Sequence, residues 1–291
     1  MDLRGDLMEI SCKEIRDDIL KTLKKQVKRL GVSPKFVIIT CSNDEASEIY
    51  VRNKLKMAKE IGIDVTHYDL NPKDYNQDSL MEFVYNMNYH FDSVMVQLPL
   101  DKKFDESEVL KRIHPNKDVD GLTRIQSSKL EYADKNALIP ATAKGCYEII
   151  RRHFKRDDLS GLKVLIINRS QLIGIPLSKL LRNKNATVTV AHSKTDDKDI
   201  NLFLWRTQDN YDVIITGIGK SMIDETTLKN KLIIDCGISR DSEGKIKRDV
   251  ILNSGCDELL KNTYYGNVGL LTVVMLMVNV IESYKNQHGL G

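Results

Sequence analysis

The chain has 291 residues, which is enough for two domains of ordinary size. Hydrophobic residues make up 41% and charged residues 29%, a composition typical of a folded globular protein and not of a disordered one. The 44 basic and 41 acidic residues leave a net charge of +3, which is too small to predict nucleic-acid binding. The longest apolar run, within 270–281, is shorter than the roughly 18 residues that a membrane span needs.

The cysteines are far apart and include no CxxC pair, which predicts reduced thiols and neither a disulfide framework nor a zinc site. The first ten residues include acidic side chains and no apolar stretch, so we expect no secretory signal. We therefore expect a cytoplasmic protein. The five cysteines are Cys12, Cys41, Cys146, Cys236 and Cys256.

The first half of the chain alternates between helical and strand patterns. Apolar residues at helical spacing predict an amphipathic helix at the start, and β-branched runs predict three buried strands. This alternation favours a mainly parallel sheet covered by helices. The expected helices span 12–30, 43–61, 79–87 and 106–113, and the expected strands span 36–40, 65–70 and 93–98.

A second, similar series follows residue 140. Its expected helices span 144–154, about 174–181 and about 270–284, and its expected strands span 163–167, 187–191, 212–216 and 232–235. We predict an α/β protein of two domains with a cleft between them. Residues 1–140 would form an N-terminal three-layer α/β domain, and residues 141–269 a C-terminal Rossmann-type domain. The closing helix, 270–291, is expected to pack back on the first domain.

Strand 163–167 leads into a tight turn and a helix, where Rossmann folds bind a pyrophosphate. Only Gly174 of the usual three glycines is present, so the turn alone also fits an ordinary strand–helix connection. The next strand ends in His192 and Ser193 instead of the carboxylate that is typical of NAD sites. With Arg169 in the first loop, this lack of negative charge favours the 2′-phosphate of NADP.

Ser47, Tyr50 and Lys54 share one face of the helix predicted over 43–61, because their spacing is i, i+3, i+7. We expect this face to lie at the carboxyl ends of the strands, where parallel sheets bind ligands, and Gln97 follows a strand at the same edge. A solvated helix face and a satisfied core amide are the structural alternatives. The loop 115–121 has two carboxylates but no EF-hand pattern, so no metal site is predicted.

Six segments, in one order along nearly the whole chain, resemble motifs of the bifunctional methylenetetrahydrofolate dehydrogenase/methenyltetrahydrofolate cyclohydrolase family. Each motif is a modest signal, but six in register are strong. The segments are S-E-I-Y-V-R-N-K at 47–54, V-Q-L-P-L at 96–100, K-D-V-D-G at 117–121, N-R-S-Q-L-I-G-I-P at 168–176, A-T-V-T-V-A-H-S-K-T at 186–195 and I-D-C-G-I at 234–238.

The resemblance implies two reactions in one cleft. The first domain would bind folate and carry out catalysis, and the second would bind NADP. With NADP, 5,10-methylenetetrahydrofolate would be oxidised to the 5,10-methenyl form, which water would convert to 10-formyltetrahydrofolate. The family also implies a role in one-carbon metabolism and purine biosynthesis. The expected partners are tetrahydrofolate derivatives and a second copy of the chain. We expect the protein to bind neither nucleic acid nor a membrane.

The same resemblance implies the roles of individual residues. Lys54, Tyr50 and Gln97 would be catalytic, because a partly desolvated lysine has a lowered pKa suited to proton transfer and a nearby amide can fix its amine. Tyr50 offers a ring for the folate to stack on. Asp120 would bind the amino and ring N–H groups of the pterin, with Tyr50, Gln97 and Ser47 also contacting the substrate. The cofactor residues would be Asn168, Arg169, Ser170, Gly174, His192, Ser193 and Ile238.

The chain departs from the family pattern mainly in the half that would bind the cofactor. Asn168 replaces a glycine, and the segment 262–272 lacks the family's prolines and contains Tyr264 and Tyr265. A cyclohydrolase with a weakened or lost dehydrogenase step is therefore an alternative. A non-catalytic folate- or nucleotide-binding protein is another. A third alternative is an NADP dehydrogenase that acts on a small alcohol or hydroxy acid. It would need a general acid beside the nicotinamide, for which His192 is the only nearby candidate.

Overall fold

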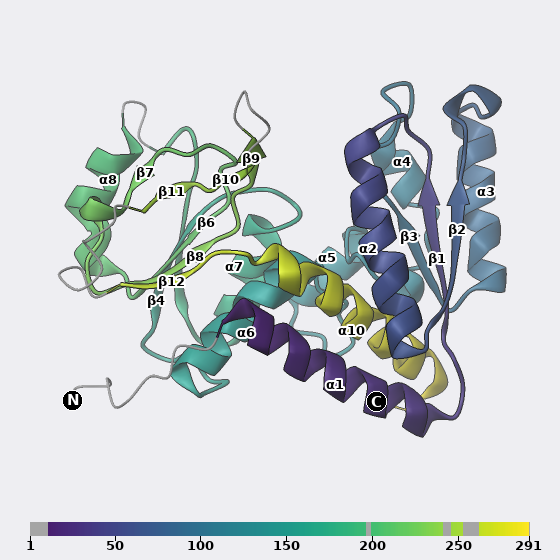
Figure 1. Ribbon diagram of the computed structural model, residues 1–291, viewed down its shortest axis with the longest axis horizontal. Helices are drawn as coiled ribbons and strands as arrows, with labels where there is room; N and C mark the ends of the chain where they lie inside the picture. Colours follow the sequence, from purple (N-terminus) through teal and green to yellow (C-terminus); the bar gives the residue numbers. More distant parts are fainter. Residues whose placement is uncertain (1–10, 196–198, 241–245, 253–261, 291) are drawn as a thin grey trace. The chain divides into compact units, whose positions relative to one another are not determined.

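The computed structural model describes residues 11–195, 199–240, 246–252 and 262–290, and Cys256 lies outside these ranges. The other four cysteines are free thiols. The described residues divide into two compact units (Figure 1). The first unit contains residues 16–141 and 273–290, and the second contains residues 11–15 and 142–272.

The sheet of the first unit has three parallel strands in the order β2-β1-β3. They are β1 (Lys35–Thr40), β2 (Asp64–Asp69) and β3 (Ser93–Val96). The central strand β1 is apolar and almost wholly buried, and its Ile39 pairs with Tyr68 on one side and Val96 on the other. The chain crosses from β1 to β2 through α2 and then back over β1 to β3 through α3. Because these two crossovers run in opposite directions, right-handed connections place α2 and α3 on opposite faces of this sheet.

The helices begin and end close to the predicted residues. Two short helices, α5 and α8, were not predicted from the apolar pattern. Each begins after a capping side chain, Thr123 for α5 and Asp199 for α8. The helices are α1 (Cys12–Leu30), α2 (Glu45–Ile61), α3 (Gln77–His90), α4 (Glu106–Leu110), α5 (Arg124–Glu131), α6 (Ala141–Phe154), α7 (Gly174–Asn183), α8 (Ile200–Thr207) and α10 (Gly269–His288).

Helix α10 is tied to the loop 115–121 of the first unit by buried polar side chains. Asn279 is fully buried, and its Nδ2 donates hydrogen bonds to the carbonyl oxygens of Val119 and Ile139, both at 2.8 Å. One turn later, the hydroxyl of Ser283 donates to the carbonyl oxygen of Asn116 at 2.7 Å. These bonds fix the backbone of the loop that contains both predicted carboxylates.

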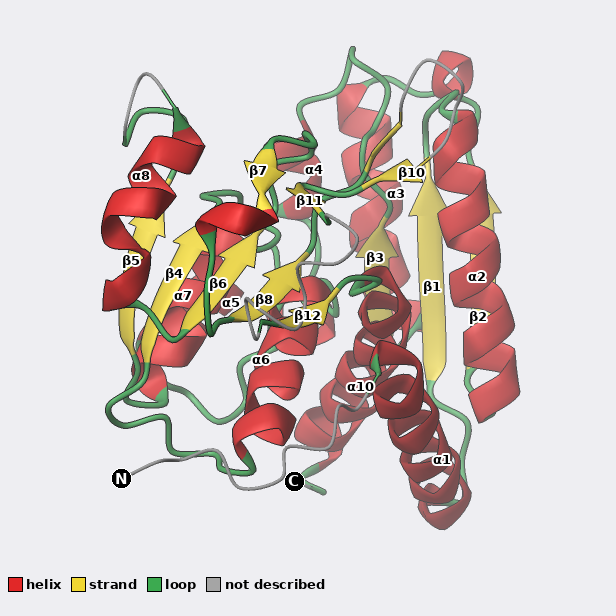
Figure 2. Cartoon of the chain, turned by 60° about the vertical axis from the view of Figure 1, so that its left-hand side comes forward, coloured by secondary structure: helices red, strands yellow, loops and turns green. Residues whose placement is uncertain are grey.

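The second unit has a five-stranded sheet in the order β12-β8-β6-β4-β5, in which all neighbours are parallel (Figure 2). The chain adds β5 on one side of β4 and then β6, β8 and β12 on the other. This reversal creates a switch point at the carboxyl ends of β4 and β6, where doubly wound sheets bind ligands. The strands are β4 (Lys163–Ile167), β5 (Thr187–Ala191), β6 (Val213–Thr216), β8 (Leu232–Asp235) and β12 (Thr263–Tyr265).

Two pairs of short strands complete the second unit. Strand β7 (Ile223–Asp224) pairs in parallel with β11 (Val250–Ile251), and β9 (Ser239–Arg240) pairs antiparallel with β10 (Ile246–Lys247). Each unit also has its own hydrophobic cluster of buried residues. The prediction of an α/β protein with parallel sheets is confirmed.

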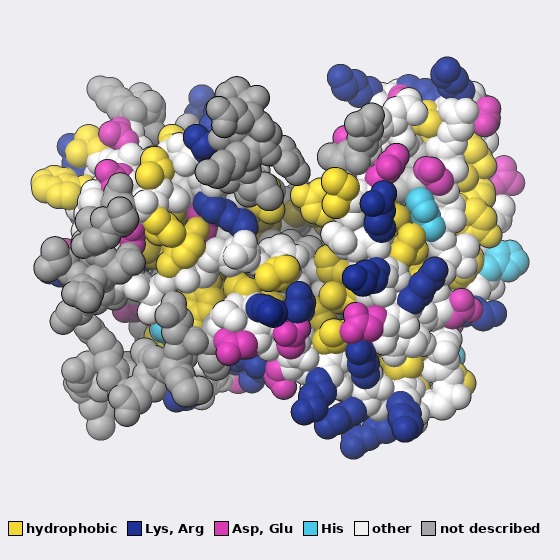
Figure 3. All heavy atoms as spheres, in the orientation of Figure 1, with side chains coloured by type: hydrophobic (Ala, Val, Ile, Leu, Met, Phe, Trp, Pro, Cys, Tyr) yellow, Lys and Arg dark blue, Asp and Glu magenta, His cyan; other side chains and the backbone are white. Residues whose placement is uncertain are grey.

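The surface carries an ordinary mixture of charges. Figure 3 shows Lys and Arg side chains gathered where the C-terminal half of α1 lies. This basic face lies opposite the buried Leu23 and Val27, as expected for an amphipathic helix. Among the described helices, none has the length and apolar character needed to cross a bilayer. The exposed basic residues of this part of α1 are Lys21, Lys24, Lys25, Lys28 and Arg29.

Candidate active site

A buried lysine meets an amide at the carboxyl end of β3. Lys54, on α2, is only 8% exposed, and its Nζ donates a hydrogen bond to Gln97 Oε1 at 2.7 Å. The Sδ atom of Met95 lies 3.6 Å from the same Nζ. Strand β3 ends one residue before Gln97, whose Nε2 donates to the carbonyl oxygen of Leu98 at 2.6 Å. The amide is therefore oriented on one side by the backbone and presents its oxygen to the lysine.

Electrostatic interactions link Lys54 to Asp120. Burial lowers the pKa of Lys54, and the Asp120 carboxylate opposes this shift. Burial also raises the pKa of Asp120 to about 6, with Asp118 adding to the shift and Lys54 opposing it. A lowered pKa makes it easier for Lys54 to lose its proton, and Asp120 is mostly ionised above about pH 6.

The two carboxylates of the loop 115–121 differ in their partners. Asp118 is fully buried, and its oxygens accept the backbone N–H groups of Gly121 at 3.0 Å and Thr123 at 2.8 Å. Gly121 has a φ of +68°, and a Cβ atom there would lie 2.4 Å from the carbonyl oxygen of Leu138. No described residue donates a hydrogen bond to the Asp120 carboxylate. Asp118 therefore holds the loop, whereas the Asp120 carboxylate makes no such bond to it.

The other two predicted folate residues also lie on α2. Tyr50 is one turn before Lys54 and is 50% exposed. The side chain of Ser47 lies outside the described part of the molecule. The structure thus brings Lys54 and Gln97 into contact, with Asp120 close enough to perturb the lysine, and it leaves the Tyr50 ring accessible.

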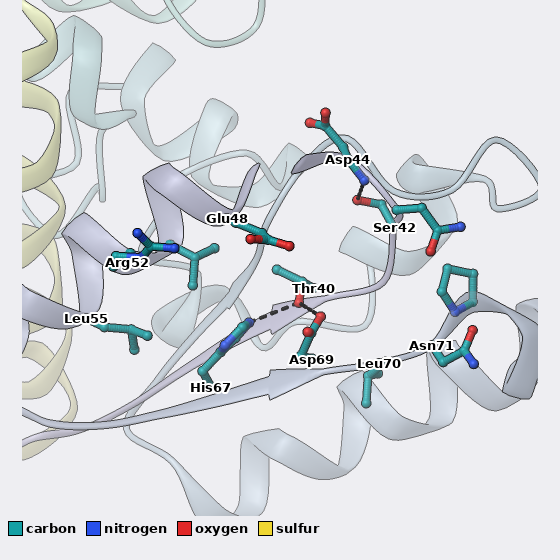
Figure 4. A pocket seen from close by; sticks show the side chains of 13 residues that line it. Thr40, Ser42, Asp44, Glu48, Arg52, Leu55, His67, Asp69, Leu70 and Asn71 are labelled. Atoms are coloured by element: carbon teal, nitrogen blue, oxygen red, sulfur yellow. Dashed lines mark hydrogen bonds between the residues drawn. The ribbon is translucent and has the colours of Figure 1, made fainter. Parts of the chain in front are cut away.

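A cavity of about 680 Å³ lies on another face of α2, between this helix and β2 (Figure 4). The hydroxyl of Thr40 donates a hydrogen bond to Asp69 Oδ1 at 2.7 Å and lies 2.9 Å from His67 Nε2. Glu48 of α2 points toward this cluster, and Arg52 of the same helix also lines the cavity. The residues that line the cavity do not include Tyr50, Lys54, Gln97 or Asp120, so it is separate from the predicted folate residues.

The turn between β4 and α7 is held by the side chain of Asn168. Its Oδ1 accepts the backbone N–H groups of Ser170 at 2.7 Å and Gly174 at 3.0 Å, and its Nδ2 donates to the carbonyl oxygen of Gly217 at 2.5 Å. The backbone at Asn168 stays outside the left-handed region. A Cβ atom at Gly174 would lie 2.0 Å from the carbonyl oxygen of Asn168, so only glycine fits there. Of the three glycines that are usual in a dinucleotide-binding turn, this turn therefore contains only Gly174.

The turn that follows β5 offers donors for an anion. His192 Nδ1 accepts the backbone N–H of Lys194 at 3.1 Å, so the neutral ring carries its proton on Nε2. Ser193 and Lys194 are exposed beside it, and Arg169 is exposed in the turn after β4. The described turn 192–195 has no carboxylate. This donor set fits the 2′-phosphate of NADP better than the free ribose hydroxyls of NAD.

Sequence reasoning missed the carboxylate that holds the loop after β6. Asp249 is fully buried and accepts the backbone N–H groups of Ile218 at 2.5 Å, Gly219 at 2.8 Å and Lys220 at 3.0 Å. The only sequence signal is Gly237, where a Cβ atom would lie 2.0 Å from Asp249 Oδ1. Ile238, the next residue after Gly237, is 43% exposed.

The two tyrosines of the segment 262–272 belong to the packing of the second unit. Tyr264 donates a hydrogen bond from its hydroxyl to Asp235 Oδ2 at 3.0 Å, and Tyr265 is buried. Both are on β12, which pairs with β8. These residues, which depart from the family motif, therefore extend the parallel sheet.

Comparison with known proteins places this geometry in a family. Residues 10–120 match the model for the catalytic domain of tetrahydrofolate dehydrogenase/cyclohydrolase, and residues 140–288 match its NAD(P)-binding domain. The bifunctional protein FolD of Rickettsia bellii is 33% identical over 284 residues, which cover 95% of this chain and 98% of that protein. The bifunctional protein FolD of Ligilactobacillus salivarius is 36% identical over 281 residues, 93% of each chain.

Among solved structures, the methylenetetrahydrofolate dehydrogenase-cyclohydrolase of Trypanosoma brucei, complexed with NADP and an inhibitor, superposes with a TM-score of 0.82. It is 26% identical, and the match covers 98% of this chain and 99% of that chain. Two family domains in the expected order, together with full-length relatives above 30% identity, show that the chain belongs to the tetrahydrofolate dehydrogenase/cyclohydrolase family.

Proposed function

We propose that the protein oxidises 5,10-methylenetetrahydrofolate with NADP and hydrolyses the resulting 5,10-methenyl cation to 10-formyltetrahydrofolate. The observation that carries the proposal, in a chain of this family, is the buried Lys54. Its amine is hydrogen-bonded to Gln97, and its pKa is influenced by Asp120. A binding protein would have no need to desolvate an amine at this position. A solvent-exposed lysine would have kept its ordinary pKa.

In the hydrolytic step, Lys54 would act on the attacking water. Its lowered pKa makes the neutral amine available to accept a proton as the oxygen of water bonds to the methenyl carbon. The protonated amine would then return that proton to N5 of the folate as the bond between carbon and N5 breaks. The remaining hydroxyl proton leaves to solvent as the formyl group forms. Gln97 would hold the amine in position throughout.

Substrate would be held by residues that flank this amine. The Asp120 carboxylate, which has no donor from the described residues, would accept hydrogen bonds from the amino and ring N–H groups of the pterin. Tyr50, exposed one turn before Lys54, would stack on the folate. Ser47 belongs to the same helix face by its spacing.

The cofactor would bind at the switch point of the second unit. Arg169, His192 and Ser193 would contact the 2′-phosphate, and the turn that contains Asn168, Ser170 and Gly174 would face the pyrophosphate. Ile238, exposed after β8, would contact the nicotinamide portion. When bound, NADP accepts the hydride that the methylene carbon of the substrate loses. The chain's own task in that step is placement of the two reactants.

Three wider features belong to the same proposal. Residues 1–140 would form the folate-binding catalytic domain, joined by the closing helix from about 270, and residues 141–269 would form the NADP-binding domain. The protein would act as a homodimer in the cytoplasm. Its product, a 10-formyl donor, would serve one-carbon metabolism and purine biosynthesis. Sedimentation of the purified protein at several concentrations tests the dimer directly.

Two assays on the purified protein test the activity. We expect 5,10-methylenetetrahydrofolate to reduce NADP, and 5,10-methenyltetrahydrofolate to be hydrolysed without any nucleotide. Hydrolysis without NADP reduction would instead select a cyclohydrolase that has lost its oxidoreductase step. The hydrogen bonds of Asn168 are the observation that favours this second function, because they use groups that a pyrophosphate would contact.

Substitution of Lys54 tests the assigned chemistry. Lys54→Met keeps the length of the side chain and removes the amine, so hydrolysis should fall by about 10²-fold or more. Binding of a folate analogue should change little. Lys56→Met, at an exposed lysine of the same helix, is the matched control and should retain full activity. Normal hydrolysis by Lys54→Met would refute the role of the amine.

A further inference from the structure

The side chain of Asn168 bridges the two turns that border the switch point of the second unit. One turn follows β4 and contains Ser170 and Gly174, and the other follows β6 and begins at Gly217. The amide of Asn168 bonds to both turns, as an acceptor in the first and a donor in the second. A Cβ atom at Gly217 would lie 3.1 Å from Asn168 Nδ2, so the amide is closely packed against that residue.

These bonds use donors that a bound pyrophosphate would otherwise attract. The N–H of Gly174 is the first of α7, and the positive end of a helix dipole attracts anions to such groups. In this chain, the neutral Oδ1 of Asn168 accepts that N–H and also the N–H of Ser170. A phosphate oxygen would have to replace an existing hydrogen bond at each donor.

We propose that Asn168 is a specificity-determining residue that weakens dinucleotide binding by occupying the pyrophosphate-facing donors of the turn after β4. This inference rests on the proposed NADP site. It concerns the pyrophosphate alone, because Arg169, His192 and Ser193, which would bind the 2′-phosphate, do not share these donors. A ligand with the 2′-phosphate but without the pyrophosphate should therefore be indifferent to Asn168.

Calorimetric titration of NADP and of adenosine 2′-monophosphate into the full-length protein and its variants tests the inference. Asn168→Gly frees two N–H groups, so the Kd for NADP should fall by about tenfold, the worth of one to two neutral hydrogen bonds. The Kd for adenosine 2′-monophosphate should stay the same. Asn168→Asp keeps the shape and both acceptor contacts but adds a negative charge, so its Kd for NADP should rise.

Asn185→Gly is the matched control. Asn185 has a φ of +68°, which glycine adopts easily, and it precedes β5 at the opposite edge of the same sheet. This variant should bind both ligands as the wild type does. An unchanged or raised Kd for NADP in Asn168→Gly would overturn the inference, as would an equal gain for both ligands. Failure of both the wild type and Asn168→Gly to bind NADP would overturn the proposed cofactor site together with this inference.

Discussion

Burial is the main cause of the shifted pKa values of Lys54 and Asp120, and both shifts suit the roles proposed for these residues. Burial disfavours the charged form of each group, so the lysine pKa falls and the aspartate pKa rises toward neutrality. Their mutual attraction opposes both shifts. The amine is held by one neutral amide, Gln97, which orients it without supplying a compensating charge. Burial therefore makes it easier for the lysine to lose its proton, while Asp120 is ionised above its raised pKa of about 6.

Asp120 predicts a pH dependence in which binding and stability change in opposite directions. The pKa of Asp120 is raised to about 6, so affinity for a folate analogue should fall as pH decreases through that value and the carboxylate becomes protonated. In the unfolded chain the same group ionises at its ordinary, lower pKa. Between that lower pKa and about pH 6, the folded state therefore becomes less stable as pH rises, because its buried carboxyl ionises less readily than the exposed one. Asn at this position would bind folate more weakly but avoid the cost.

Asp120→Asn should therefore have a higher urea midpoint than the wild type near pH 8, and the difference should vanish near pH 4, where both side chains are neutral. Its affinity for the analogue should be low and nearly independent of pH. Asp134→Asn, at an exposed aspartate of the same unit, should alter neither property. Equal midpoints for Asp120→Asn and wild type near pH 8 would contradict the burial argument.

Among the elements, α10 shows how a polar residue inside an apolar helix can organise a distant loop. Its apolar run predicts a helix, and the helix is present. The pattern treats Asn279 only as an interruption, because the carbonyl groups that it binds lie about 140–160 residues earlier in the chain. Burial of an amide in such a helix is favourable only because both of its N–H bonds are made.

Asn279→Leu should destabilise the protein by about 1–3 kcal/mol, since it leaves the buried carbonyl oxygens of Val119 and Ile139 without this donor. Leucine has the same branched side-chain skeleton as asparagine, with bulkier methyl groups, so no cavity contributes to the loss. Urea unfolding measures the change. Asn286→Leu, on the last turns of the same helix, loses only one 3.4 Å bond to Asn136 and should cost less than about 0.5 kcal/mol. Equal costs would contradict a special role for Asn279.

The elements that sequence could predict are those with a strong local pattern. The apolar run of β1 is sufficient to predict a buried strand, and the apolar stripe of α1 is sufficient to predict a helix. Lys54 and Gln97 could be paired because each lies where a predicted element reaches the carboxyl edge of one parallel sheet. Asp249 could not be predicted, because its three N–H donors precede it by about thirty residues and nothing periodic connects them. The short helix α5 depends on its cap and has little apolar pattern.

At the scale of the whole molecule, the two units have separate sheets and separate hydrophobic clusters. The proposed folate residues belong to the first unit and the proposed cofactor residues to the second. Each ligand should therefore protect a different, identifiable part of the chain. Ligand binding stabilises the state that binds, by about 2.7 kcal/mol at a concentration one hundred times the Kd.

Hydrogen exchange measured by mass spectrometry should show this division. NADP should slow exchange in peptides that cover 168–175 and 192–195, and a folate analogue should slow it in peptides that cover 50–54 and 117–121. NAD at the same concentration should protect much less, because it lacks the phosphate for which Arg169, His192 and Ser193 provide donors. Equal protection by NAD and NADP would contradict the assignment of these residues to the 2′-phosphate. Protection of 168–175 alone would still support the switch point as the dinucleotide site.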